Sequence, residues 1–224
     1  MTPAVIAHRG ASGHAHENSP AAFKRAVELG ADSVELDIHA TPDGALLVHH
    51  DAEVKGIGRI GELPRSAFDG YRLPNGESIP ALAEVLTLLA GLTVWVEVKS
   101  LPPAMDAELL RTLDAGPTPA KYAVHGFDHR IVKRLGDRRP GLRRGVLLAS
   151  YVLDTPAVLR GAGADTLWME THLIDPDLVG VVHAVGGRIV AWTANDEREI
   201  RRLIALGVDG ICGNYPDRIR AALG

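Results

Sequence analysis

Two carboxylates stand two residues apart in the apolar segment of residues 33–39. Every second residue from Val34 to Ile38 is apolar, a period that predicts a β-strand. Glu35 and Asp37 therefore share one face of that strand, and we expect this face to be interior. Paired interior carboxylates repel each other and lose hydration, which costs several kcal/mol for each ion. A divalent cation between them offsets this cost, although exposure to solvent or pairing with arginine is the alternative.

Side chains of the types that transfer protons, bind metals or bind anions also stand at the ends of the other apolar segments. The positions at or just after the predicted strand ends are His8, Arg9, Glu35, Asp37, His50, Glu97, Lys99, His125, Glu170 and Trp192. A surface of solvated charges would not select strand ends so consistently. We therefore expect these side chains to meet at one site.

Three of these residues form a candidate metal site. Glu35, Asp37 and Glu97 offer hard oxygen ligands, which suit Mg²⁺ or Ca²⁺ as the cofactor. The sequence has no set of three histidines or of cysteines at ligand spacing, which argues against zinc.

Two cations and two histidines complete the predicted chemistry. Arg9 and Lys99 stand beside the metal ligands, which points to an anionic substrate. Phosphate is the natural candidate, because arginine offers two parallel donors and lysine a point charge. His8 and His50 then supply an acid and a base for displacement at phosphorus.

The elements that must position these residues alternate as short apolar strands and amphipathic helices. Such alternation indicates a parallel sheet with crossover helices, and eight closed units make a (β/α)8 TIM barrel. A doubly wound open sheet is the alternative, but no glycine fingerprint follows the first strand. The predicted strands cover residues 4–8, 33–39, 93–99, 122–125, 143–146, 166–169, 188–192 and 210–212, and the predicted helices cover residues 20–29, 80–89, 105–113, 129–135, 155–160, 176–185, 197–206 and 216–223.

Residues 51–78 interrupt this alternation after the second strand. Glycine and proline punctuate the segment, and a short strand over residues 45–49 precedes it. We expect a small insertion, too short for a core of its own. The whole chain, residues 1–224, is thus predicted to be a single barrel domain.

Composition limits the classes of partner. The chain of 224 residues has a formal net charge of -4, which gives no footprint for nucleic acid. No apolar run approaches a membrane span and no signal peptide is evident, so we expect a cytoplasmic protein without stable membrane insertion. Cys212 is the one cysteine, and we expect a buried filler. Arginines at 138, 139, 143 and 144 form a basic cluster that we expect to be a solvated face. Oligomeric state stays open.

Several short motifs occur together in one order along nearly the whole chain. They are His8-Arg9-Gly10, Glu17-Asn18-Ser19, Glu35-Leu36-Asp37, Thr41-Pro42-Asp43-Gly44 with His50-Asp51, Glu97-Val98-Lys99, Ala191-Trp192-Thr193-Ala194-Asn195, Gly207-Val208-Asp209-Gly210 and Asn214-Tyr215-Pro216. The ordered set resembles the glycerophosphodiester phosphodiesterase family.

The resemblance implies a metal-dependent (β/α)8 barrel with an insertion after its second strand. It implies hydrolysis of a glycerophosphodiester, a small molecule, to sn-glycerol 3-phosphate and an alcohol. By position, His8 and His50 correspond to the family's acid–base pair. Glu35, Asp37 and Glu97 correspond to its metal ligands.

Further positions take roles from the same resemblance. Arg9 and Lys99 correspond to the cations that contact phosphate. Glu17 corresponds to an acid of the first loop, which either is a metal ligand itself or orients another group. Two further residues are candidates because they stand at strand ends, independently of the resemblance. Trp192 either forms a wall for the substrate or plugs the barrel mouth, and Glu170 is a candidate to line the pocket.

Departures from the family pattern concern the substrate head group. His16 stands where the family usually has proline, and residues 54–57 lack the Leu-x-Arg-Thr pattern that often follows the second histidine. A lysophospholipase D-type reaction is therefore an alternative. A catalytically silent barrel that binds phosphodiesters is another, although no key position is missing. The nucleophile is either water or the substrate's own glycerol hydroxyl.

Overall fold

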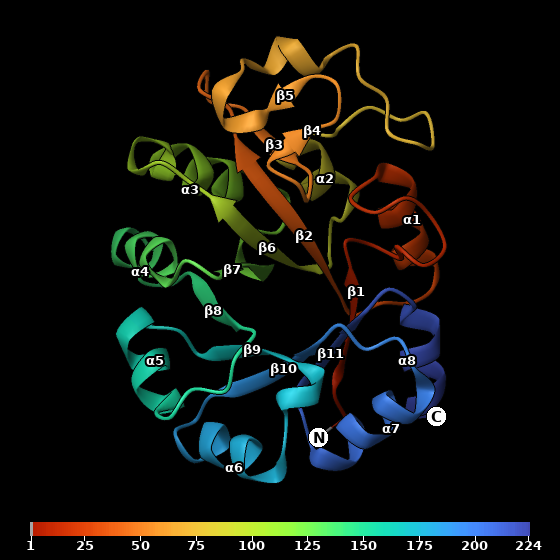
Figure 1. Ribbon diagram of the computed structural model, residues 1–224, viewed down its shortest axis with the longest axis vertical. Helices are drawn as coiled ribbons and strands as arrows, with labels where there is room; N and C mark the ends of the chain where they lie inside the picture. Colours follow the sequence, from red (N-terminus) through yellow and green to blue (C-terminus); the bar gives the residue numbers. More distant parts are fainter. Residues whose placement is uncertain (1) are drawn as a thin grey trace.

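Eight parallel strands alternate with eight α-helices in the computed structural model, which describes residues 2–224 (Figure 1). Strand β1 pairs with both β11 and β2, so the sheet closes into a barrel. The predicted (β/α)8 architecture is confirmed. The barrel strands are β1 (Ala4–His8), β2 (Ser33–Ala40), β6 (Thr93–Ser100), β7 (Tyr122–Gly126), β8 (Arg143–Leu148), β9 (Thr166–Glu170), β10 (Arg188–Trp192) and β11 (Gly210–Gly213).

The helices ring the strands (Figure 1). Ser19 and Asp128 cap α1 and α4 with their side chains, which accept hydrogen bonds from backbone N–H groups of the first turn. Helix α2 begins at Leu82, two residues later than expected, because the carbonyl of Pro80 accepts a hydrogen bond from Val48 N at 2.9 Å. No helix within residues 2–224 is long and apolar enough to cross a membrane. The helices are α1 (Pro20–Glu28), α2 (Leu82–Leu88), α3 (Asp106–Ala115), α4 (His129–Arg138), α5 (Thr155–Ala162), α6 (Pro176–Ala184), α7 (Glu197–Leu206) and α8 (Pro216–Leu223).

The interior of the barrel is filled by inward-facing side chains, while outward-facing ones pack against the helices. Two large apolar clusters lie between sheet and helices. Cys212 is fully buried inside the barrel, as predicted for a filler. The interior apolar layer consists of Ile6, Trp95, Ala123, Leu147, Trp168, Val190 and Cys212.

The segment after β2 forms a small subassembly at the top of Figure 1. Strand β3 (Leu46–Val48) runs antiparallel to β2, and β4 (Glu53–Val54) pairs with β5 (Gly58–Arg59). The short helices η1 (Ile60–Glu62) and η2 (Arg65–Phe68) follow. Val54, Ile60, Phe68 and Leu73 of this segment are buried in one apolar cluster together with the flanking Leu47 and Ile79.

Strand register brings the charged side chains of neighbouring strands level. His8 on β1 pairs with Glu35 on β2. Asp37 on β2 pairs with Glu97 on β6, which in turn pairs with His125 on β7. The strand-end residues of the sequence therefore meet at the carboxyl end of the barrel, where TIM-barrel active sites lie.

Candidate active site

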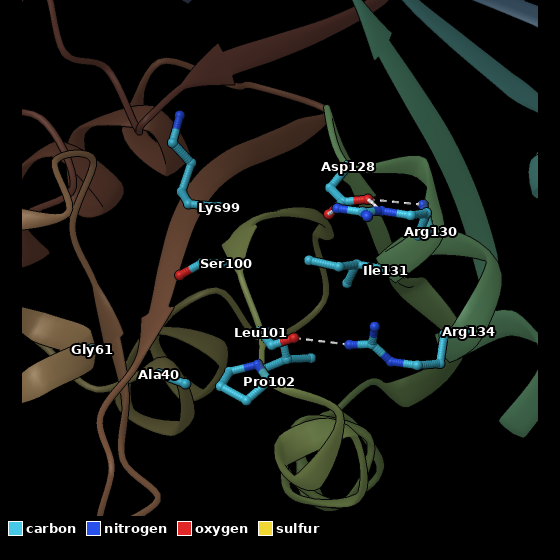
Figure 2. Close-up of a pocket in the computed structure, with 10 residues that line it drawn as sticks. All are labelled: Ala40, Gly61, Lys99, Ser100, Leu101, Pro102, Asp128, Arg130, Ile131 and Arg134. Atoms are coloured by element: carbon cyan, nitrogen blue, oxygen red, sulfur yellow. Dashed lines mark hydrogen bonds and ion pairs between the residues drawn. The ribbon is translucent and has the colours of Figure 1, made fainter.

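A cavity of about 580 Å³ opens where β2 and β6 end and α4 begins (Figure 2). Lys99 lies at one end of this cavity, and at the other Arg134 donates a hydrogen bond to the Leu101 carbonyl at 2.8 Å. Asp128 and Arg130 pair with each other at 2.7 Å on its wall. The volume is within the range of about 300–1,000 Å³ that small-molecule sites occupy.

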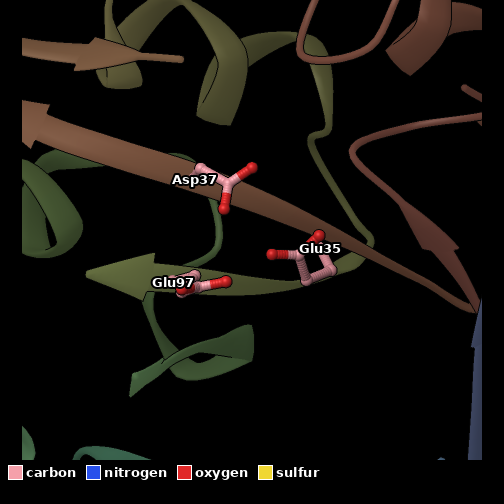
Figure 3. A group of neighbouring side chains, drawn as sticks. All are labelled: Glu35, Asp37 and Glu97. Atoms are coloured by element: carbon pink, nitrogen blue, oxygen red, sulfur yellow. The ribbon is translucent and has the colours of Figure 1, made fainter. Parts of the chain in front are cut away.

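Three carboxylates gather beside Lys99, inside the barrel. Glu35 and Asp37 project from β2 and Glu97 from β6 toward one another (Figure 3). Their residues are only 2%, 0% and 8% exposed. One oxygen from each lies within 4.8 Å of the others. The predicted triad therefore forms, and it is buried.

Two cations partly neutralise the triad. Arg9 Nε lies 3.1 Å from Asp37 Oδ2, and Lys99 Nζ lies 2.9 Å from Glu97 Oε1 and 3.5 Å from Asp37 Oδ1. Burial opposes ionisation of Asp37, but the charges of Arg9 and Lys99 outweigh it and lower the pKa of this carboxyl. Three carboxylates thus face two cations.

The two glutamates carry the cost of this imbalance. Burial, together with the charge of Asp37, raises the pKa of Glu35 to about 7. Burial and the charges of Asp37 and Glu35 raise the pKa of Glu97 to about 7 as well. The site therefore favours a further positive charge near neutral pH.

A divalent metal fits this arrangement. Asp37 Oδ1 is buried and has no hydrogen-bond partner within residues 2–224. Glu35, Asp37 and Glu97 present oxygen donors alone, which Mg²⁺ and Ca²⁺ prefer. An ion among them would satisfy the orphaned oxygen and balance the excess charge.

Arg9 is held by a left-handed backbone turn. Its φ of 56° is uncommon for a residue with a side chain and costs about 1–3 kcal/mol. This conformation lets Arg9 N donate to Glu35 Oε2 at 3.1 Å while the guanidinium reaches Asp37. Glu17, which is partly exposed, accepts from Arg9 Nη1 at 2.9 Å. Glu17 therefore lies behind Arg9 and outside the triad.

Asn18 is a functional candidate that the sequence analysis missed. Its Nδ2 donates to Asp37 Oδ2 at 2.8 Å, and the residue is buried. Asn18 also adopts a left-handed φ of 54°, and its backbone N donates to the Arg9 carbonyl at 3.0 Å. Its place in the motif Glu17-Asn18-Ser19 is the signal that could have identified it.

His8 lines a narrow recess together with Glu35 and Glu97. Its Nδ1 lies 2.7 Å from Asn214 Oδ1, an acceptor, so Nδ1 carries the proton and Nε2 is left for proton transfer. Asn214 N in turn donates to Asn195 Oδ1 at 2.8 Å. Asn195 and Asn214, which follow β10 and β11, thus orient the histidine at the end of β1.

His50 reaches the same end of the barrel through β3. His49 N donates to the Asp37 carbonyl at 3.1 Å, which places the β3 end against β2. His39, which is buried, contacts the His50 carbonyl through Nε2 at 3.0 Å. His50 Nδ1 lies 2.8 Å from Asp51 Oδ1. His50 is therefore fixed by its backbone and by an adjacent carboxylate, in the manner of an oriented acid or base.

Three other strand-end residues differ in their surroundings. His125 is buried with Nε2 3.7 Å from Glu35 Oε1, and burial lowers its pKa to about 4, so it is neutral. Trp192 lines the recess and packs edge-on against Phe127, with ring centroids 5.7 Å apart. Glu170 lies 3.5 Å from His172 and outside the triad.

Comparison with known proteins agrees with this geometry. Residues 8–218 match the profile of the glycerophosphoryl diester phosphodiesterase family. A glycerophosphodiester phosphodiesterase of Caldanaerobacter subterraneus is 32% identical over 236 residues, which cover 98% of this chain and 97% of the relative.

Solved structures show the same fold. A phosphodiesterase of Oleispira antarctica, solved with the product sn-glycerol-3-phosphate, superposes with a TM-score of 0.93 at 24% identity and covers 99% of this chain and 97% of that one. A glycerophosphodiester phosphodiesterase of Agrobacterium tumefaciens superposes at 0.83 with 27% identity, over 99% of this chain and 100% of that one. With a family profile that spans nearly the whole chain and a relative aligned end to end, this chain belongs to the glycerophosphoryl diester phosphodiesterase family and is an enzyme of that class.

Proposed function

We propose that the enzyme hydrolyses glycerophosphodiesters to sn-glycerol 3-phosphate and an alcohol, with metal-assisted histidine catalysis. The buried triad of Glu35, Asp37 and Glu97, short of positive charge and bordered by His8, is the observation that carries this proposal. The family match and the product bound to the Oleispira antarctica protein support the substrate class.

In this proposal Glu35, Asp37 and Glu97 hold Mg²⁺ or Ca²⁺. When bound, the ion supplies positive charge that offsets the negative charge on the phosphate. Arg9 and Lys99, which already border the triad, are the protein's own cations toward the same phosphate. Their ion pairs with Asp37 and Glu97 hold both cations beside the triad.

His8 and His50 are proposed as the acid–base pair. Asn214 holds Nδ1 of His8 and Asp51 holds Nδ1 of His50, so each ring has Nε2 available. One histidine removes a proton from the nucleophile, and the other donates a proton to the departing alkoxide. This pair serves attack by water and attack by the substrate's glycerol hydroxyl alike.

We place the departing alcohol in the cavity beside Lys99. Its charged groups are already paired, Asp128 with Arg130 and Arg134 with Asp106, at 2.7 Å each. Lys99 pairs with Glu97 at 2.9 Å, so within residues 2–224 every charged side chain that lines the cavity has an ion-pair partner and none is left to select one head group. We therefore propose that the enzyme accepts several alcohols at similar rates.

Lysophospholipids are a second candidate substrate class, favoured by one observation. Phe127 is half-exposed and packs against Trp192 at the recess, which offers an apolar surface to an acyl chain. Hydrolysis of lysophosphatidylcholine faster than of glycerophosphocholine would make this the principal activity.

We also propose that the whole chain acts as one domain. The insertion shares its apolar cluster with Leu47 and Ile79, which flank it on the barrel side. His50 directly precedes the insertion, so the position of this histidine depends on how the insertion packs. Deleting residues 52–78 is therefore expected to abolish activity and to destabilise the barrel as well.

The decisive experiment measures sn-glycerol 3-phosphate release from glycerophosphocholine and glycerophosphoethanolamine with Mg²⁺, with Ca²⁺ and with EDTA. Release should require a divalent metal, and His8→Ala or His50→Ala should abolish it in folded protein. Glu35→Ala should also weaken metal binding in calorimetry. His183→Ala, on the far helix α6, is the matched control and should keep full activity. Full activity of His50→Ala, or full activity in EDTA, would contradict the proposal, and metal binding without any turnover would favour the silent binding barrel.

A further inference from the structure

The amino-terminal end of the barrel contains a second polar cavity, of about 230 Å³, at the opposite end from the triad. It is lined by the first inward-facing residues of several strands, and the Trp95 ring forms its inner wall. Ser33, Thr93 and Thr166 contribute hydroxyl groups to the lining. This end of a TIM barrel ordinarily serves stability, so a built polar cavity here needs its own explanation.

Two arginines line this cavity, Arg143 half-buried and Arg188 exposed at its mouth. Arg143 shares a strand face with the interior residue Leu147, and Arg188 shares one with the interior residue Val190. The Arg143 guanidinium carbon lies 5.2 Å from the centre of the Trp95 ring. Within residues 2–224, neither guanidinium forms an ion pair or a hydrogen bond through its side chain.

The two acids that line the cavity are engaged elsewhere. Asp32 pairs with Arg220 at 2.7 Å and accepts a backbone N–H at 2.8 Å. Asp209 pairs with His183 at 2.9 Å and accepts another backbone N–H at 2.8 Å. These acids therefore leave the charges of the inward arginines uncompensated at close range.

One further acid acts from outside the lining. Asp165 accepts the Thr166 hydroxyl at 2.7 Å and attracts Arg143 at longer range. Burial nevertheless outweighs this attraction and lowers the pKa of Arg143. The positive charge of Arg188 lowers it further. A half-buried guanidinium next to a second one is stabilised by an anion between them.

We propose that this cavity binds a small tetrahedral oxyanion of the phosphate class, gripped by Arg143 and Arg188. Arginine forks match phosphate oxygens in pairs, and the hydroxyls of Ser33 and Thr93 line the same space. The volume is below the roughly 300 Å³ at which organic ligand sites begin. The site therefore takes inorganic phosphate or a compact phosphomonoester, and it does not depend on the substrate proposed above.

The test uses the full chain in EDTA at constant ionic strength, with chloride replaced by inorganic phosphate. Calorimetry gives the dissociation constant, and thermal unfolding gives the protection. The Arg143→Gln/Arg188→Gln protein should bind phosphate at least about tenfold more weakly than the wild type, because charge-assisted hydrogen bonds are lost. The matched control replaces two exposed arginines without ion pairs, Arg160→Gln/Arg198→Gln, and should bind as the wild type does.

A third variant separates this cavity from the catalytic end. Lys99→Gln removes a cation beside the triad and should leave the phosphate affinity of the amino-terminal cavity unchanged. Phosphate binding that is lost in Lys99→Gln and kept in the double arginine variant would overturn the proposal. So would equal binding by the double variant and its control. If the glutamine variant does not fold, Arg143→Lys/Arg188→Lys keeps the charge without the forked donors and should still bind more weakly. Repeating the titration with sn-glycerol 3-phosphate distinguishes free phosphate from a phosphomonoester as the ligand.

Discussion

Glu35→Gln should stabilise the metal-free enzyme, and increasingly so as the pH rises. The pKa of Glu35 is raised from its ordinary 4.5 to about 7 by burial and by Asp37. A carboxyl group with a raised pKa contributes its full stabilisation of the folded state below pH 4.5, where it is protonated. This contribution is lost as the pH rises through about 7. At about 1.36 kcal/mol for each pH unit across that interval, ionising Glu35 costs the folded protein about 3 kcal/mol. Glutamine has nearly the same shape, can still accept from Arg9 N and carries no charge.

The assay is urea unfolding in EDTA, which gives the free energy of unfolding at pH 5 and at pH 8. The free energy of unfolding of Glu35→Gln minus that of the wild type should rise by about 2–3 kcal/mol from pH 5 to pH 8, because part of the change already occurs below pH 5. Glu53→Gln, at an exposed glutamate, is the control and should show no such change. If the difference in free energy of unfolding between Glu35→Gln and the wild type is the same at pH 5 and at pH 8, the reasoning is refuted. Saturating Mg²⁺ or Ca²⁺ should reverse the order at pH 8, because only the wild type keeps the complete ligand set.

Further predictions test the residues that orient the site. Asn18→Ala removes the hydrogen bond to Asp37 and should weaken metal binding by about 10–100-fold in calorimetry. Asn214→Ala frees the ring of His8 and should lower kcat by about 10–100-fold with metal affinity unchanged, as steady-state kinetics and calorimetry would show. Phe68→Ala empties the small core of the insertion and should lower the free energy of unfolding by about 3–5 kcal/mol in urea titrations.

Each of these predictions has its own contrary result. Asn75→Ala, at an exposed asparagine, is the control for both asparagine variants and should alter neither quantity. Equal metal affinity in Asn18→Ala and Asn75→Ala would show that Asp37 needs no support from Asn18. A fall in metal affinity in Asn214→Ala would assign that residue to the metal site instead of His8. A loss below about 1 kcal/mol in Phe68→Ala would mean that the insertion is loosely packed.

The triad could be predicted from the sequence because a strand has a strict period of two. Glu35 and Asp37 must share a face of the strand. The apolar alternation that predicts the strand, and the strand–helix alternation that predicts a parallel sheet, can both be read from neighbouring residues. Glu97 follows from the same reasoning on the neighbouring strand. The eight strand-helix units follow from alternation alone, apart from one helix start, where a tertiary hydrogen bond from Val48 holds Pro80 outside α2.

The residues that support the site could not be predicted in this way. Asn18 reaches Asp37 from a loop, through a left-handed backbone that no periodicity announces. Asn214 meets His8 across 206 positions of sequence, and only closure of the barrel brings them together. Such contacts depend on loop conformation and on the join between β1 and β11.

The arginines near β8 show how linear proximity misleads in a barrel. Arg143 and Arg144 are neighbours in what the sequence presents as one solvated basic cluster, but alternation sends them to opposite faces. Arg144 packs against Gly136 of α4, where a Cβ would meet its guanidinium, and Arg143 turns inward onto Trp95. A single strand thus supplies one cation to the helix layer and one to the barrel interior.

The barrel interior changes from acidic to basic along its axis, and aromatic rings separate the two ends. Glu35 and His125 lie above the Trp95 and Trp168 rings, which contact each other edge-on with centroids 5.2 Å apart, and Arg143 lies below. The aromatic layer lies between that guanidinium and the triad, so in our proposal the missing positive charge comes from a metal ion at the open carboxyl end.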